Sequence, residues 1–136
     1  MSAVWFNGSM SLGTLEVDAH ERGLTLGDGV FETVAVIDGK AQWLQRHVER
    51  MKAAAGELGI LLNGEQLILG ITAVLARSAS PSEVMRVTLT RGVAARGLAG
   101  EGKVPSLLLT LDAFSAANRF MPCKLATCKV RRNKNA

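Results

Sequence analysis

The stretch HERGLTLGDGVFETVAV, residues 20–36, joins a glycine-rich, charged segment directly to a run of apolar and β-branched residues. Within it, Gly27 and Gly29 flank Asp28. Because glycine tolerates positive φ and allows close backbone approach, such a segment is typical of a loop that bends sharply and admits a ligand. The following residues, VFETVAVI at 30–37, have the composition of a strand. The sequence therefore predicts a functional loop that leads into a rigid strand.

Turn signals and hydrophobic periodicity extend this prediction to the rest of the chain. Asn7-Gly8 and Asp38-Gly39 are hairpin dipeptides, and apolar residues recur at helical spacing from Leu44 to Leu58, just before Gly59. We expect strands at 3–7, 30–37, 40–44, 84–92, 106–114 and 123–130, and helices at 44–58 and 65–77. Strands that are not separated by regular crossover helices predict an α+β fold, with two helices packed on a mainly antiparallel sheet. We expect residues 1–136 to form a single domain.

Composition limits the function classes. The chain has 136 residues, of which 48% are hydrophobic, which is enough for one core. It has neither a long uncharged apolar run nor the start of a signal peptide, so we expect a cytoplasmic protein without a membrane partner. The net charge of +4 comes largely from basic residues near the end of the chain. With 4% aromatic residues and no tyrosine, nucleic-acid binding by base stacking is disfavoured.

The metal-ligating residue types are sparse. Cys123 and Cys128 are five positions apart in a predicted strand, where side chains alternate between faces, which argues against a disulfide between them or a shared metal. His20 and His47 are the only histidines. We therefore expect no metal site.

Charged residues mark three candidate positions. Glu32 alternates with valines on one face of the predicted strand, so it is either a residue of the sheet rim or part of a site. Arg50, on the same helix flank as His47, can bind an anion with two parallel donors, or it is an ordinary solvated arginine paired with a nearby glutamate. Arg96 lies in the glycine-rich loop 91–105, where it is either solvated or free to bind a carboxylate. Arg91, at the end of a predicted strand, can point toward a cavity mouth.

Three segments together carry a family resemblance: HERGLTLGDGVFETVAVIDGK, RHVERM and RVTLTRGVAARGL, in this order. With them the chain resembles the class IV, fold type IV pyridoxal-phosphate enzymes, a group that includes branched-chain and D-amino acid aminotransferases and aminodeoxychorismate lyase. The resemblance implies pyridoxal 5'-phosphate as cofactor, an amino acid or aminodeoxychorismate as substrate, and a homodimer. It also implies that Arg50 binds the cofactor phosphate, that Phe31 faces the substrate pocket and that Arg96 holds a substrate carboxylate.

Two departures refine this resemblance. D-amino acid aminotransferases carry a tyrosine where Phe31 stands and a histidine where Leu98 stands, so this chain should hold their substrates poorly. Aminodeoxychorismate lyases look closer, with a phenylalanine after the glycine loop and an RGxxxRG arrangement. The resemblance also places the Schiff-base lysine beyond the end of this chain. We therefore expect no catalytic residue within it, and we expect an N-terminal half that is inactive alone.

A second class of function fits the same residues. A natural short protein that keeps the α+β frame and pairs with another chain would be a non-catalytic binding or interaction module. Such a protein would fold without binding the cofactor.

Overall fold

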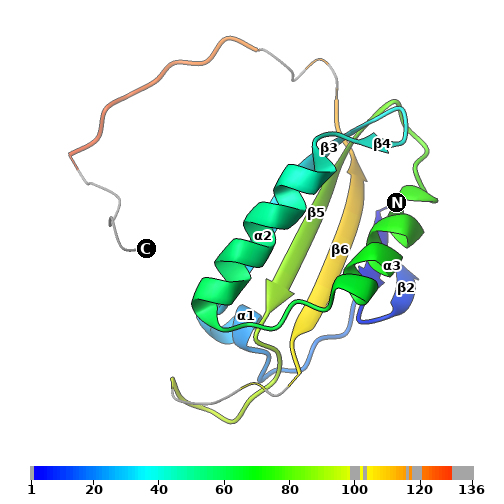
Figure 1. Cartoon of the computed structure of the whole chain (residues 1–136). Coiled ribbons are helices and arrows are strands. Elements are labelled where there is room, and N and C mark those ends of the chain that lie inside the picture. The colour runs from blue at the N-terminus through cyan, green and yellow to red at the C-terminus, as the bar shows by residue number, and fades with distance from the viewer. Residues whose placement is uncertain (1, 99–101, 103, 116, 118–120, 130–136) are drawn as a thin grey trace.

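The computed structural model describes residues 2–98, 102, 104–115, 117 and 121–129. A single sheet with the strand order β2-β1-β6-β5-β3-β4 organises this part of the chain, and all its pairings are antiparallel (Figure 1). The strands are β1 (Ala3–Phe6), β2 (Ser9–Leu12), β3 (Gly29–Ile37), β4 (Lys40–Ala41), β5 (Ser82–Thr90) and β6 (Ser106–Ala113), and the helices are α1 (Arg22–Leu26), α2 (Leu44–Leu58) and α3 (Gly64–Leu75). The predicted α+β class is confirmed.

Both long helices cover the same face of the sheet, with α2 against β3 and α3 against β6 and β1 (Figure 1). The end of α2 is set by Gly59, which has a φ of 65° and whose N–H donates to carbonyls of the last turn. The start of α3 is set by Asn63, whose side chain accepts a hydrogen bond from the N–H of Gln66. These local signals explain why both predicted helices form close to their predicted bounds.

The hydrophobic core lies between the helices and the sheet. Alternate residues of each strand point into it, so that on β3 Val34 and Val36 are fully buried while their neighbours are not. The largest fully buried side chains are Met51, Met85, Leu89, Leu109, Val34, Val36 and Val74. The strand alternation predicted for β3 is therefore correct, and it places Glu32 on the covered face beside the core.

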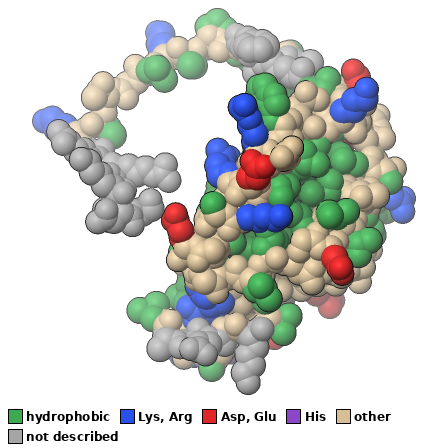
Figure 2. Space-filling model, in the orientation of Figure 1, with side chains coloured by type: hydrophobic (Ala, Val, Ile, Leu, Met, Phe, Trp, Pro, Cys, Tyr) green, Lys and Arg blue, Asp and Glu red, His purple; other side chains and the backbone are tan. Residues whose placement is uncertain are grey.

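Apolar side chains also reach the surface between the two helices. Figure 2 shows them gathered in the centre of this face. A groove of about 380 Å³ lies there, lined in part by Leu44 and Val48 of α2 and by Ile68 and Ile71 of α3. No long apolar helix that could cross a bilayer is found in the described part of the chain.

The prediction of a strand at 123–130 is wrong for the residues that the structure describes. Residues 123–129 form no regular structure, and their side chains are exposed, with Leu125 94% exposed. Position 130 lies outside the described residues. The six strands of the sheet, from edge strand β2 to edge strand β4, do not include this segment. A short alternating pattern with no partner strand does not form a ladder by itself.

Two smaller predictions also need correction. The strand expected at 40–44 contains only Lys40 and Ala41, because Trp43 adopts a left-handed conformation with a φ of 48° and the helix begins at Leu44. The segment before β3 was expected to be a loop, yet Arg22–Leu26 forms the short helix α1. With α1 the described part of the chain has three helices where two were expected.

Candidate functional site

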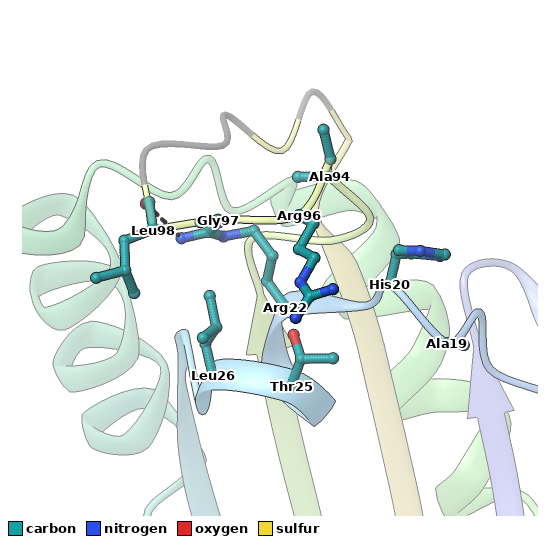
Figure 3. Close-up of a pocket in the computed structure, with 10 residues that line it drawn as sticks. Ala19, His20, Arg22, Thr25, Leu26, Ala94, Arg96, Gly97 and Leu98 are labelled. Carbon is teal, nitrogen blue, oxygen red and sulfur yellow. Dashed lines mark hydrogen bonds between the residues drawn. The ribbon is translucent and has the colours of Figure 1, made fainter.

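A pocket of about 410 Å³ lies where the two glycine-rich segments meet at one end of the sheet. It is lined by Ala19, His20, Arg22, Thr25, Leu26, Ala94, Ala95, Arg96, Gly97 and Leu98. Figure 3 shows the Arg96 side chain extending from the 94–98 segment toward Thr25, between Arg22 and His20. Within the described residues no hydrogen bond or ion pair engages the Arg96 guanidinium. The pocket therefore combines a largely apolar wall with a cation whose donors face its interior.

The segment before β3 packs directly against the end of β5. The carboxylate of Glu21 accepts hydrogen bonds from the Leu24 N–H, at 3.0 Å, and from the Thr90 hydroxyl, at 2.5 Å. Gly23 and Gly29 allow this contact, since an added Cβ would lie 2.3 Å from Thr90 Cγ2 at the first position and 2.4 Å from the Leu89 carbonyl oxygen at the second. Glycine is required at these two positions for close packing against β5, while Gly27 has a positive φ of 64°.

Asp28 connects this segment to two arginines. Its Oδ2 accepts from Arg22 Nε at 2.7 Å and from Arg91 Nε at 2.8 Å. Arg91 Nη2 also donates to the Leu58 carbonyl at 2.8 Å, at the end of α2. Hydrogen bonding by Arg91, followed by that of Arg22, holds the pKa of Asp28 below its ordinary value. The two cations and one carboxylate leave a positive local charge beside the pocket.

The prediction that Arg91 points toward a cavity mouth is therefore not met. Its guanidinium is committed to Asp28 and to the carbonyls at the end of α2, and Arg91 does not line the pocket. Pairing satisfies the charge of a partly buried guanidinium, which explains this orientation. Sequence reasoning also missed Arg22 and the role of Asp28. The position of Asp28 between two glycines was the only signal for it.

A second polar cluster lies on the covered face, where α2 crosses β3. Glu32 is 6% exposed, and its Oε1 and Oε2 accept from Arg50 Nε at 2.7 Å and from Arg50 Nη2 at 2.5 Å. His47 Nδ1 lies 2.7 Å from Glu32 Oε2. His47 and Arg50 are three residues apart on α2, so both reach the same carboxylate. Glu32 is thus a partnered buried acid, and Arg50 is held in a fixed orientation.

This pairing has opposite effects on the two partners. The hydrogen bonds from Arg50, followed by that from His47, lower the pKa of Glu32 despite its burial. The same carboxylate raises the pKa of Arg50. Arg50 nevertheless keeps a side chain that is 70% exposed, so part of its guanidinium faces outward.

We expect the Glu32 cluster to make stability depend on acid pH. Because the folded-state pKa is lowered, the contribution is fully present above the ordinary carboxyl pKa of about 4.5 and is lost as the pH falls through the lowered value. Urea unfolding of the wild type and of Glu32→Gln at pH 7 and at successively lower pH measures this. The Glu32→Gln protein should be less stable at pH 7 and should show a shallower decline as the pH falls below 4.5. Asp28 and Asp18, whose pKa values are also lowered, supply the remaining slope. Parallel declines would contradict the assignment.

Phe31 lies on the opposite face of β3. It is 55% exposed, and Arg86 of the neighbouring strand β5 sits over its ring, 3.8 Å from the ring centre. Thr33 and Ala35 share this face and are also exposed, so no described helix covers this part of the sheet. Phe31 is not among the residues that line the pocket at Arg96.

The structure therefore does not bring the three predicted site residues into mutual contact. Arg50 is on the covered side of β3, Phe31 on its open side, and Arg96 in the segment that follows β5. Contacts between described residues join none of these side chains to another. Their roles remain predictions. In the described part of the chain no three side chains of the His, Cys, Asp and Glu types gather as metal ligands, and Cys123 and Cys128 are exposed thiols.

Comparison with known proteins defines the class. The family profile described as "Amino-transferase class IV" matches residues 29–136, most of the chain. The chain therefore belongs to the class IV amino-transferase family, as the resemblance indicated. The aminodeoxychorismate lyase of Vibrio harveyi is 28% identical over 132 residues, which are 93% of this chain and 47% of that protein. The D-alanine aminotransferase of Staphylococcus aureus (strain MSSA476) is 32% identical over 99 residues, which are 71% of this chain and 35% of that protein.

Solved structures agree with this class. The 4-amino-4-deoxychorismate lyase of Pseudomonas aeruginosa is 29% identical and matches with a TM-score of 0.67, covering 81% of this chain and 39% of that one. The branched-chain amino acid aminotransferase of Escherichia coli, at 18% identity, shares the fold, with a TM-score of 0.72, covering 83% of this chain and 41% of that one. The chain thus has the predicted fold of fold type IV enzymes, and it spans less than half the length of these relatives.

Proposed function

We propose that this chain is the N-terminal part of a two-domain enzyme that uses pyridoxal 5'-phosphate, either an aminodeoxychorismate lyase or an aminotransferase. Membership of the class IV family supports the cofactor, and the small share of each relative that the chain covers supports a larger whole. The lysine that binds the cofactor covalently would come from the remainder of that protein. A homodimer and a cytoplasmic location belong to the same proposal.

The geometry of Arg50 is compatible with a cofactor phosphate. Glu32 occupies Nε and one Nη2 hydrogen, while Nη1 has no partner among the described residues and the side chain is 70% exposed. The guanidinium therefore keeps donors for a phosphate oxygen while Glu32 fixes its plane. The bound cofactor supplies an electron sink for the carbon that loses a proton. Arg50 itself orients the phosphate and moves no proton.

The pocket at Arg96 is the observation that carries the substrate proposal. A carboxylate entering it meets the free donors of Arg96 and the apolar side chains of Leu26 and Leu98. Charge-assisted hydrogen bonds to a carboxylate are about twice as strong as neutral ones. The nearby carboxylate of Asp28 is already paired with Arg22 and Arg91, so it does not neutralise the charge of Arg96. Arg96 would bind and orient the substrate carboxylate.

Two residues favour the lyase over a D-amino acid aminotransferase. By the resemblance, D-amino acid aminotransferases carry a tyrosine at the position of Phe31 and a histidine at the position of Leu98. Phe31 lacks the tyrosine hydroxyl, and Leu98 lacks the histidine imidazole. Leu98 lines the pocket with an apolar side chain. A site without those two hydrogen-bond donors should bind the carboxylate of a D-amino acid weakly.

A product assay on the whole protein tests the proposal. We expect 4-aminobenzoate and pyruvate to be released from aminodeoxychorismate without an amino acceptor, and Arg96→Met to raise KM by about tenfold or more. Arg77→Met, which removes an exposed arginine after α3, is the matched control and should leave KM unchanged. Turnover that requires a 2-oxo acid identifies the aminotransferase instead. Absence of both activities in a cofactor-loaded protein refutes the proposal.

A further inference from the structure

The side chain of Arg22 is only 8% exposed, and it makes three hydrogen bonds to other parts of the chain. Its Nε donates to Asp28 Oδ2 at 2.7 Å, its Nη1 to the Gly97 carbonyl at 3.0 Å and its Nη2 to the Leu98 carbonyl at 3.2 Å. Figure 3 shows its guanidinium extending alongside the segment that carries Gly97 and Leu98. Residues that are 75 and 76 positions away in the sequence are thus joined by one side chain.

The two carbonyls that Arg22 binds directly follow Arg96. Upstream of Arg96, the segment is held by a bridge between Glu21 and Val93 and by the Ala94 N–H, which donates to the His20 carbonyl at 3.4 Å. Among the described residues, no other group donates to the Gly97 and Leu98 carbonyls. Arg22 is therefore the downstream anchor of the segment, and Arg96 is held from both sides.

The backbone of this segment needs such an anchor. Gly97 has a φ of 121°, in a region that glycine enters readily because it has no Cβ. Such a flexible residue keeps one conformation only when neighbouring groups hold its peptide bonds. The segment also forms no regular ladder beyond the bridge at Val93. A guanidinium fork with two parallel donors fixes the orientation of two successive carbonyls, which a lysine ammonium does less well.

We propose that Arg22 is a positioning residue that directs Arg96 into the pocket by fixing the Gly97 and Leu98 carbonyls, with Asp28 holding Arg22 in turn. The inference rests on the proposed function for the identity of the ligand, a carboxylate. The anchoring itself depends only on the contacts. Arg22 is not a catalytic residue, because its donors are directed at the backbone and at Asp28.

Proteolysis of the whole protein tests the anchor independently of any activity. Trypsin cleaves after Arg96 only when that backbone is released, so Arg22→Met should speed cleavage of the Arg96–Gly97 bond by about tenfold or more, as expected for local opening. Arg77→Met should leave the rate at Arg96 unchanged. Mass analysis of the fragments identifies the bond. Equal rates in wild type and Arg22→Met would overturn the proposed anchor.

Steady-state kinetics test the positioning role. With the carboxylate substrate identified by the product assay, Arg22→Met should raise KM by about tenfold while kcat changes by less than about twofold, because uniform binding is lost. Arg22→Lys, which keeps the charge, should recover part of the KM. A fall in kcat with unchanged KM, or no recovery with lysine, would overturn the positioning role. If Arg22→Met shows no cooperative melt, Arg22→Lys is tested alone and must show a smaller increase in both the cleavage rate and KM.

Proteolysis and the activity assays together separate the anchoring role of Arg22 from the proposed function. Faster cleavage at Arg96 in a protein that has neither predicted activity would support the anchor and refute the proposed function. Unchanged cleavage in an active enzyme would do the reverse.

Discussion

Replacing Arg50 by methionine is expected to weaken the affinity of the whole protein for pyridoxal phosphate by about a hundredfold, because a charge-assisted contact to the phosphate is lost. Arg50 is suited to this contact since Glu32 orients its guanidinium and the side chain remains 70% exposed. Equilibrium titration with the cofactor measures the effect. Methionine replaces the aliphatic stem of the arginine side chain without its guanidinium, so the packing along α2 changes little.

Arg46→Met is the matched control for this measurement. Arg46 is an exposed arginine on the same helix and has no partner among the described residues, so its removal changes the net charge equally. Cofactor affinity should then stay close to that of the wild type. Unchanged affinity in Arg50→Met itself would remove Arg50 from the cofactor site. Thermal melting of both variants separates lost binding from the loss of the Glu32 pairing.

Replacing Asp28 by alanine is expected to lower the free energy of unfolding by about 2–3 kcal/mol, a large effect for one surface-proximal side chain. The carboxylate is 15% exposed and pairs with both Arg22 and Arg91, which are 8% and 25% exposed. Its removal leaves two partly buried guanidinium groups without their counter-charge. The partial exposure of Arg91 places the cost below that of a fully buried pair.

Urea unfolding at neutral pH measures this change. Glu57→Ala removes one negative charge from an exposed position on α2 and is expected to leave the unfolding free energy nearly unchanged. A similar small loss in Asp28→Ala would show that the two arginines are solvated adequately without it. The connection between α1, the end of α2 and the 94–98 segment would then be energetically unimportant.

The long strands and helices could be predicted because their signals are local. Val34 and Val36 show the alternation of a half-buried strand, and Gly59 and Asn63 mark helix ends through their own backbone and side-chain chemistry. Residues 123–130 gave a similar local signal, but a strand also needs an edge to pair with. Local patterns do not say whether a segment will pair with such an edge, and this prediction was wrong for the described residues 123–129.

The candidate site was predicted only in part. Arg96 was recognised as a cation in a glycine-rich loop, and it does line a pocket. The partners of Asp28 could not be deduced, because Arg91 is 63 residues away and the pairing depends on where β3 and β5 end in the folded sheet. The pairing of Glu32 with Arg50 is likewise set by the crossing of α2 over β3. Long-range register decides these contacts.

The open face of β3 connects the fold to the proposal. Phe31 is 55% exposed beside Arg86, on a sheet face that no described helix covers. This exposure leaves the Phe31 ring available to contact another surface. In the proposed enzyme, Phe31 would face the substrate and the remainder of the protein.

The most direct test of the central claim is titration of the whole wild-type protein with pyridoxal phosphate, followed by its visible absorption. The account predicts saturable binding of one cofactor per chain, with a new absorption band of the protein-bound cofactor. At the same cofactor concentration this band should be weaker in Arg50→Met, because a smaller fraction of that protein is bound. A folded whole protein that binds no cofactor, or one whose binding does not respond to the loss of Arg50, would contradict it.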